Sequence, residues 1–457
     1  MIIKIDQELC TGCRQCATVC PVDAIEGIDG EPQELNEDLC VNCGQCVQMC
    51  SSFALAFDDE ITPIAEKLEE RGMFQSTKEP IFAAYAKGDV IRVKEALENN
   101  DLQTVVQCAP AVRVALAEEF GMELGSLTPG KLAAALRALN FTKVYDTDFT
   151  ADLTIMEEGS ELIERVTEGG ALPMFTSCCP AWVKYMEQTY PELNDHLSTC
   201  KSPQQMAGTI FKTYAAKIDK LDPAKIYSVS IMPCTAKKFE CDRPEMNDSG
   251  HQDVDVVLTT RELAYLIKEA GIDFANLADE EFDSPLGEYS GAGVIFGATG
   301  GVMEAALRTG YELITKKPIP NVEINAVRGG EGVRTAIVKV GDLDLKVGIV
   351  AGLKNVVPLL EDLKAGKSDY HFIEVMTCPE GCISGGGQPK VLLEEHKQLA
   401  YENRTASIYQ HDEELPVRKS HENPSITRIY KEFLGEPLGK ESHRLLHTEY
   451  ISRKETK

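Results

Sequence analysis

Two segments near the start of the sequence carry cysteines at a spacing that can hold iron. The stretches "CTGCRQCATVCP" and "CVNCGQCVQMCS" each contain the run C-x2-C-x2-C-x3-C, which supplies thiolate ligands to iron–sulfur clusters. Three thiolates separated by two residues can hold one face of a four-iron cubane, while the fourth points away and completes the neighbouring cluster. We therefore predict two 4Fe–4S clusters. Their ligands are Cys10, Cys13, Cys16 and Cys50 for one, and Cys40, Cys43, Cys46 and Cys20 for the other.

Residues 1–57 as a whole resemble a bacterial-type ferredoxin, a small two-fold repeat of the α+β class. Pro21 follows Cys20, as is usual, whereas Ser51 stands at the matching place after Cys50. This departure leaves the ligands intact and changes only the local turn. Zinc sites or disulfides are the structural alternatives, and a doubled pattern of eight cysteines disfavours both. We expect this module to conduct electrons.

A second group of cysteines lies in three remote segments, "TSCCPAW", "IMPCTAKKFECD" and "EVMTCPEGCISGGGQP". Cys178 and Cys179 are adjacent, so their side chains project in different directions and do not easily serve the same atom. Either one of them is idle, or the two thiols have different roles. Cys378 and Cys382 are four apart, and nearby glycines let the backbone approach a bulky group closely. One thiolate from each of the first two segments and two from the third would hold another cubane.

These three segments resemble the signatures of FeFe hydrogenases, a family in which a ferredoxin-like front module is common. The resemblance extends through "KVYDTDFTADLTIMEE", "PELNDHLSTCKSPQQMAGTIFKTYA" and "LHTEY", so it covers nearly all of the chain. It implies an H-cluster, which is a 4Fe–4S cubane bridged through a cysteine sulfur to a di-iron unit with carbon monoxide, cyanide and azadithiolate. By this resemblance the cubane ligands are Cys179, Cys234, Cys378 and Cys382, of which Cys382 is shared with the di-iron unit.

The resemblance also implies roles for acid–base side chains. Cys178 would exchange protons with the azadithiolate amine, and an unperturbed thiol pKa of about 8.5 is close enough to neutrality for both directions. Glu158 and Glu161 share one helix face, and Arg165 follows one turn later. The relay that the family has at the matching positions runs from Cys178 through a water to Glu158, Ser198 and Glu161. The alternatives are a buried apolar role for Cys178 and an ordinary solvated pair of glutamates.

Further residues match family positions around the di-iron unit. Lys237, three residues after Cys234, would pair with a cyanide as a compact cationic donor, and Lys238 would lie at the surface. Ala111 occupies a place where some relatives have serine, so one hydroxyl contact to a cyanide would be missing. The matching pocket positions are Pro110, Gln204, Met232, Phe296 and Met376. The two methionines would fit a gap-filling core role equally well.

Strands and helices must hold these residues in place. The stretches "KIYSVSIMPC" and "TAIVKVGDLDLKVGIVAGL" are β-rich, whereas "RELAYLIKEAG" and "VMEAALRTGYELIT" have helical apolar spacing. Alternating strands and helices predict an α/β fold with mostly parallel sheets, which we expect to form a two-lobed H-cluster domain over residues 80–400. Residues 58–79 are charged and contain prolines, and are predicted to form a connector. Residues 401–457 are predicted to be mainly helical and resemble the hydrogenase small subunit.

Composition and short motifs disfavour several other classes of function. The net charge of −27 argues against nucleic acid as a partner, because phosphate binding needs a basic surface. No apolar run approaches the ~20 residues that span a bilayer, and the first residues lack a secretory signal. We therefore expect a cytoplasmic protein without a membrane partner. The stretch "GAGVIFGATGGVMEAAL" lacks the lysine and hydroxyl of a phosphate-binding loop. No G-x-G-x-x-G follows a strand elsewhere with a matching acid, so no flavin or nicotinamide site is expected.

The expected activity is the reversible interconversion of dihydrogen with protons and electrons. Electrons would pass through the two ferredoxin-like clusters, in exchange with a soluble ferredoxin or flavodoxin. Two alternatives stay open, a sensory hydrogenase and a non-catalytic hydrogenase-like iron–sulfur protein. A sensor usually carries an added signalling domain, and a cubane carrier has no use for Cys178, the two glutamates or Lys237. Three cysteines have no predicted role beyond that of buried or free thiols, and these are Cys108, Cys200 and Cys241.

Overall fold

The computed structural model describes residues 2–54, 67–73, 80–330, 332–341 and 343–454. Two four-stranded sheets form the centre of the main body. The first sheet has the order β11–β10–β7–β8, and all of its neighbouring strands are parallel. Its strands are β7 (Gln103–Cys108), β8 (Lys143–Val144), β10 (Ile226–Met232) and β11 (Val256–Thr259).

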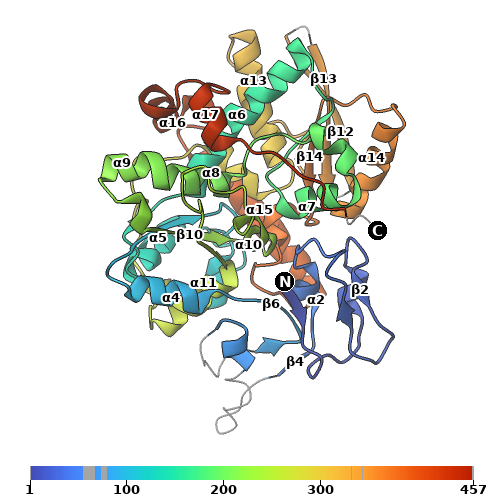
Figure 1. Cartoon of the computed structure of the whole chain (residues 1–457), viewed down its shortest axis with the longest axis vertical. Coiled ribbons are helices and arrows are strands. Elements are labelled where there is room, and N and C mark those ends of the chain that lie inside the picture. Colours follow the sequence, from blue (N-terminus) through green and yellow to red (C-terminus); the bar gives the residue numbers. More distant parts are fainter. Residues whose placement is uncertain (1, 55–66, 74–79, 331, 342, 455–457) are drawn as a thin grey trace.

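The second sheet has the order β12–β13–β14–β9. Its strands are β9 (Met174–Phe175), β12 (Val333–Val340), β13 (Leu343–Ala351) and β14 (Phe372–Met376). Strands β12 and β13 form an antiparallel pair, whereas β13, β14 and β9 run parallel. In Figure 1 this sheet lies at the upper right, and β10 of the first sheet lies to the left at about mid-height. The predicted α/β fold with mostly parallel sheets is confirmed.

The carboxyl ends of four strands lead directly into the predicted site segments. Strand β7 is followed by Pro110, β10 by Cys234, β9 by Cys179 and β14 by Cys378, each within four residues of the strand end. In α/β proteins, ligands bind outside the carboxyl ends of parallel strands, where the loops begin. This arrangement explains how segments far apart in the sequence reach one place.

Helices surround both sheets, and the longest one lies between two cores. Helix α6 (Thr147–Glu168) packs against α8, α12 and α13. Its Ala151 and Ile155 enter the core beside the second sheet, whereas Phe149 and Leu153 enter a separate core beside Ile226. The other helices of the body are α4 (Val90–Glu98), α5 (Pro129–Ala138), α7 (Pro180–Thr189), α8 (Pro203–Ile210), α9 (Ala216–Asp219), α10 (Ala236–Cys241), α11 (Thr260–Glu269), α12 (Gly291–Val294), α13 (Gly301–Thr315) and α14 (Val357–Lys364).

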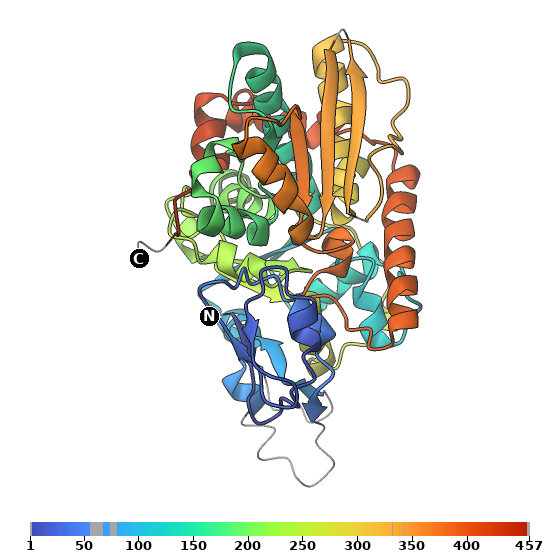
Figure 2. The same cartoon turned by 90° about the vertical axis from the view of Figure 1, so that its right-hand side faces the viewer.

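The N-terminal module lies at one end of the body, where Figure 2 shows it in dark blue. Its elements are β1 (Ile3–Ile5), α1 (Gln15–Thr18), β2 (Ile25–Glu26), β3 (Glu34–Leu35), α2 (Gln45–Met49) and β4 (Phe53–Ala54). Strand β1 pairs with β6 (Ala84–Ala86), and β4 pairs with β5 (Ile81–Phe82). Two of the module's small sheets are thus completed from beyond residue 57, whereas β2 pairs with β3 within the module. The predicted connector at 58–79 lies mostly outside the described residues.

The last part of the chain is helical. Its helices are α15 (Glu394–Glu414), α16 (Pro424–Ile429) and α17 (Lys440–Leu446). Helix α15 packs against α12, and its buried Arg404 forms an ion pair with Glu118 at 2.5 Å. Over the part of the chain that the structure describes, none of the helices combines the length and the apolar character that crossing a bilayer requires.

Candidate active site

A cavity lies where the carboxyl ends of the two sheets face each other. Its lining includes the four predicted cubane ligands together with Cys178 and Lys237. It also includes all five predicted pocket positions, Pro110, Gln204, Met232, Phe296 and Met376. The structure therefore gathers in one place the residues that the resemblance assigned to the surroundings of an H-cluster.

The adjacent thiols Cys178 and Cys179 face different surroundings, as their adjacency predicted. Cys178 packs with the core that contains Met376, whereas Cys179 packs with the core that contains Trp182. The Cys179 Sγ also donates to Thr377 Oγ1 at 3.3 Å. Burial, and then the nearby Glu158, raises the pKa of Cys178 well above its usual value. The Cys178 thiol therefore holds its proton at neutral pH, and its pKa lies further above neutrality than that of an unperturbed thiol.

The donor set in the cavity suits a cubane. All four predicted ligands are free cysteines. Burial, and then the neighbouring Cys179, raises the pKa of Cys234 to about 12. Burial is also the largest cause that raises the pKa of Cys378, and the neighbouring Cys234 and Cys179 add to it. Thiolates crowded together in a buried site need a compensating cation, and iron supplies it. These residues therefore fit the 4Fe–4S part of an H-cluster.

Lys237 reaches the cavity from α10. Its Nζ donates to the carbonyl oxygen of Cys178 at 3.0 Å and forms an ion pair with Glu240 Oε2 at 2.9 Å. Burial opposes the charged form, but Glu240 outweighs burial and raises the pKa of Lys237. Glu240 also accepts hydrogen bonds from Gln204 Nε2 at 3.0 Å and Ser202 Oγ at 2.8 Å. Sequence reasoning missed Glu240, although its place three residues after a candidate lysine on a helix was an available signal.

The prediction that Lys238 lies at the surface is wrong. Its side chain is buried, and its Nζ forms ion pairs with Asp89 at 2.7 Å and Glu262 at 3.0 Å. Neighbouring positions on a helix point in different directions, so α10 directs Lys237 to the cavity and Lys238 away from it. Because α10 packs against both β11 and α7, Lys238 meets protein instead of solvent.

Two of the predicted relay residues, Ser198 and Glu161, contact each other directly, and Arg165 contacts the same glutamate. Ser198 Oγ donates to Glu161 Oε2 at 2.8 Å, and Arg165 Nη2 donates to Glu161 Oε1 at 2.6 Å. The backbone N–H of Thr199 also donates to the same carboxylate at 3.1 Å. Helix α6 supplies Glu161 and Arg165 one turn apart, while Ser198 comes from the loop between α7 and α8. Glu161 is therefore held firmly as a hydrogen-bonded carboxylate.

Glu158 lies one turn before Glu161 and is bound quite differently. Its side chain is buried, and neither carboxylate oxygen has a hydrogen-bond partner among the described residues. Burial, and then the neighbouring charge of Glu161, raises the pKa of Glu158 to about 8. At neutral pH this group is a carboxylic acid, which can both donate and accept a proton. The water predicted between Cys178 and Glu158 stays a prediction.

The cysteines of the N-terminal module gather in the two predicted sets. Burial, and then the nearby Cys10 and Cys50, raises the pKa of Cys16 to about 11. Burial also raises the pKa of Cys46 well above its usual value. After burial, the thiols that raise the pKa of Cys46 most are the three other members of its own predicted set, Cys43, Cys40 and Cys20. Proximity within each set fits two separate clusters.

The loop that carries Cys43 touches the active-site segment. Gln45 Nε2 donates to the Sγ of Cys378 at 3.2 Å and to the carbonyl oxygen of Ser384 at 3.1 Å. A Cβ atom added at Gly386 would lie 2.4 Å from the Cys43 carbonyl oxygen, so only glycine permits this approach. Sequence reasoning missed Gln45, because its partner is 333 positions away and no local pattern marks the contact.

Comparison with known families agrees with this geometry. Residues 102–386 match the family described as "Iron only hydrogenase large subunit, C-terminal domain". The chain belongs to the iron-only hydrogenase family. Residues 398–453 match "Iron hydrogenase small subunit", and residues 3–26 and 34–55 match "4Fe-4S binding domain". The predicted kinds of cofactor, 4Fe–4S clusters and an H-cluster, are confirmed at the level of the family.

Several individual proteins are similar to this iron-only hydrogenase family member. The NADP-reducing hydrogenase subunit HndD of Solidesulfovibrio fructosivorans is 53% identical over 79% of this chain and 62% of its own length. Iron hydrogenase 1 of Clostridium pasteurianum is 45% identical over 81% of this chain and 65% of its own length. The chain thus spans less than two thirds of either relative. A cytosolic iron–sulfur assembly component of Mus musculus is 31% identical over 78% of this chain and 76% of its own length.

Solved structures give the same result. A variant of the [FeFe]-hydrogenase HydA1 from Chlamydomonas reinhardtii aligns with a TM-score of 0.70 and 42% sequence identity. The alignment covers 79% of this chain and 99% of that protein. The fold of the main body is therefore that of an FeFe hydrogenase.

Proposed function

We propose that this chain catalyses the reversible interconversion of dihydrogen with protons and electrons. The observation that carries the proposal is the cavity in which four cysteines meet a fifth thiol, Cys178, and the Lys237–Glu240 ion pair. A protein that only held a cubane would need the four ligands and nothing more. When bound, the H-cluster supplies the metal centre at which dihydrogen is formed or split.

The protein's own part begins with proton movement. Cys178 carries a proton at the wall of the cavity, and the neutral Glu158 stands behind it in the buried interior. Ser198 and Glu161 continue the route through a direct hydrogen bond of 2.8 Å. Arg165 fixes the carboxylate at the far end. We propose that protons pass along these residues between the cavity and the outside.

The protein's second contribution is a cavity that carries a positive charge and excludes water. The ammonium of Lys237 would bind the anionic cyanide side of the cofactor, and Glu240 keeps this ammonium charged despite its burial. The apolar side chains of Met232, Phe296 and Met376 line the same cavity and exclude water. A dry site strengthens the electrostatic interactions within it.

Electrons would cross the N-terminal module in two steps. The set around Cys43 adjoins the active-site segment through Gln45 and Gly386. The other set includes the exposed Cys13 and is nearer to solvent, so it would meet the electron partner. We propose a soluble ferredoxin or flavodoxin as that partner. A second candidate is a protein that passes electrons to NADP, which the similarity to a subunit of an NADP-reducing hydrogenase favours.

The test is a gas assay on chain matured with the di-iron cofactor. We expect dihydrogen evolution from reduced methyl viologen, and uptake with the oxidised dye. A preparation that contains the complete cofactor and yet shows no turnover would contradict the proposal. Slow turnover alone, far below that of a similarly matured iron hydrogenase, would favour the sensory alternative. Failure to take up the di-iron unit would favour the non-catalytic one.

A further inference from the structure

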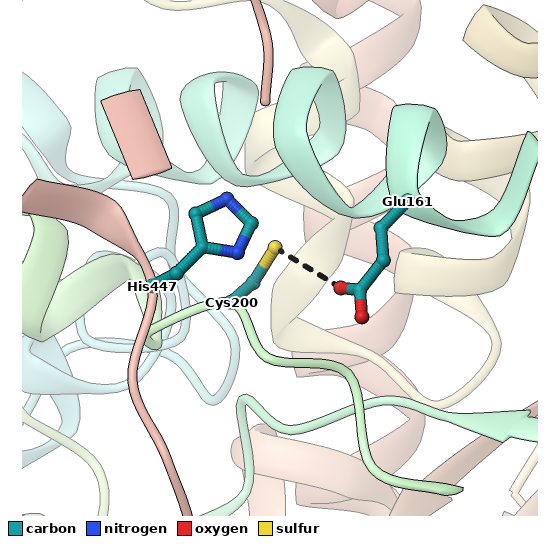
Figure 3. A group of neighbouring side chains, drawn as sticks. All are labelled: Glu161, Cys200 and His447. Atoms are coloured by element: carbon teal, nitrogen blue, oxygen red, sulfur yellow. Dashed lines mark hydrogen bonds between the residues drawn. The ribbon is translucent and has the colours of Figure 1, made fainter. Parts of the chain in front are cut away.

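Next to the outer end of the proposed relay lies a group of side chains that the proposed function does not use. Cys200 and His447 stand beside Glu161, and all three are buried. One ligand atom from each of these residues lies within 4.8 Å of the other two. Figure 3 shows the sulfur of Cys200 between the carboxylate of Glu161, which projects from α6, and the imidazole of His447. We infer that these residues form a binding site for a thiophilic divalent cation such as Zn²⁺.

The spacing of the donor atoms is close to what zinc requires. A tetrahedral Zn²⁺ with sulfur, nitrogen and oxygen ligands holds neighbouring donors about 3.3–3.8 Å apart. Cys200 Sγ and Glu161 Oε2 are already 3.7 Å apart. Side-chain adjustments of about 1 Å would bring the imidazole of His447 to the same separation. Thiolate, imidazole, carboxylate and one water would complete the four positions.

The imidazole of His447 is oriented from behind by a second carboxylate. Its Nε2 lies 3.1 Å from Glu157 Oε2, and Glu157 is fully buried and also accepts from the hydroxyl of Tyr430. A histidine that binds a metal usually donates its other ring N–H to a carboxylate, which fixes the tautomer and the ring orientation. With the proton on Nε2, the lone pair of Nδ1 faces the group, where Thr199 Oγ1 lies at 2.7 Å.

Charge also favours a cation here. Glu157 and Glu161 bring two carboxylates to the group, and Arg165 engages only Oε1 of Glu161. Oε2 faces Cys200 and accepts hydrogen bonds from Ser198 Oγ and from the backbone N–H of Thr199. Binding of Zn²⁺ would displace one proton from the Cys200 thiol to solvent, and no electrons would be transferred.

The group has an exposed histidine beside it, and a metal bound there would have a consequence for the relay. The exposed His443 stacks on His447 with ring centroids 4.7 Å apart, so an imidazole at the surface lies against the buried one. A metal bound to Oε2 of Glu161 occupies the oxygen that receives the hydrogen bond from Ser198. Zinc would therefore close the relay at this point. This consequence rests on the proposed function, whereas the binding itself does not.

The binding is tested on cluster-loaded protein mixed with one equivalent of ZnCl₂ and freed of excess metal. We expect one zinc per chain, with unchanged iron content, in the wild type and in the matched control Cys108→Ala, which removes another buried thiol. Cys200→Ala should lose the zinc, and His447→Gln serves as a second variant. Crystals should show an anomalous peak at the zinc edge among these three side chains. Undiminished zinc in both variants, or a peak elsewhere, would overturn the inference.

The consequence has its own readout. In matured protein, zinc should suppress dihydrogen evolution reversibly, with recovery on addition of EDTA, in the wild type and in Cys108→Ala. Each variant is compared with its own zinc-free rate, and Cys200→Ala should resist zinc. If zinc binds at the site and dihydrogen evolution is not suppressed, the inference that zinc closes the relay is wrong. If matured protein shows no hydrogenase activity at all, the proposed function fails while the zinc content still decides the site.

Discussion

The two proposed routes into the active-site cavity, one for electrons and one for protons, are built in different ways. On the electron side, the N-terminal module touches the cavity segment directly, through the 3.2 Å contact of Gln45 with Cys378 and the close backbone approach at Gly386. On the proton side, Glu158 is buried without a partner among the described residues, between the cavity thiol Cys178 and the firmly bound Glu161. The electron side relies on packing between two modules, and the proton side relies on single ionisable side chains.

This difference follows from what each particle needs. An electron moves between neighbouring clusters, so the protein has only to hold them close together. A proton needs a donor or acceptor at every step, and each step can fail through one substitution. Exchange of D₂ with solvent protons consumes no net electrons. This assay therefore distinguishes a defect in proton transfer from a defect in electron transfer. Changes on the proton side should impair both dye-linked turnover and exchange, whereas changes on the electron side should impair dye-linked turnover alone.

The largest effect is expected from Cys178→Ala. The substitution leaves no side chain to carry a proton between the cavity and Glu158, so turnover should fall by about 10²–10⁴-fold. Iron content and the infrared bands of the diatomic ligands should persist, because Cys178 is not among the predicted ligands. Dihydrogen evolution, D₂ exchange and iron analysis on the same preparation measure this. Retention of most of the activity would remove Cys178 from the relay.

Glu158→Gln should have the next largest effect. The amide keeps the shape of the side chain but cannot release a proton, so both turnover and exchange should fall by about 10²-fold. Glu164→Gln is the matched control, since Glu164 is exposed on the same helix. An equal loss in both variants would show a general disturbance of α6 instead of a broken relay.

On the electron side, Gly386→Ala should weaken dye-linked turnover without weakening exchange. A Cβ atom 2.4 Å from the Cys43 carbonyl oxygen must push the module outward. We expect a loss of about tenfold in dye-linked dihydrogen evolution, since a forced shift of about 1 Å enlarges the gap between clusters. Gly310→Ala is the control, because no described atom lies within 4 Å of a Cβ there. A parallel loss of exchange would contradict the division into two sides.

The smallest effect concerns stability. The pKa of Glu158 is about 8 in the folded chain, against about 4.3 for an unperturbed glutamate. As pH rises between these values, the unfolded chain loses this proton before the folded chain does, so folding becomes less favourable. Glu158→Gln removes this penalty. The Tm of the variant minus that of the wild type should therefore grow by several degrees from pH 5 to pH 8, and it should stay level for Glu164→Gln.

The sequence was most informative where ligands follow one another closely. The spacing of the eight N-terminal cysteines predicted two clusters directly, and residues 3–26 and 34–55 match a 4Fe–4S family. The predicted H-cluster ligands needed the family resemblance, because they come from segments that only the two sheets bring together. Within the main body, alternating strands and helices were sufficient to predict the α/β class. The domain limits at residues 57, 79 and 400 and the cytoplasmic location stay predictions.

What the sequence did not predict depends on long-range contacts. Gln45 carries no local signal, since its partner Cys378 lies in another module. Lys238 was wrongly placed at the surface, because a sequence does not show which faces of a short helix are covered. Glu240 is different, because its spacing from Lys237 was an available signal that sequence reasoning missed, and its carboxylate raises the pKa of Lys237.

The most direct test of the central claim is infrared spectroscopy of the matured chain in the carbonyl and cyanide stretching region. If Cys179, Cys234, Cys378 and Cys382 hold an H-cluster, carbonyl and cyanide bands should appear in the wild type and disappear in Cys382→Ala. A wild-type sample that contains its full complement of cubanes and shows no such bands would contradict the account.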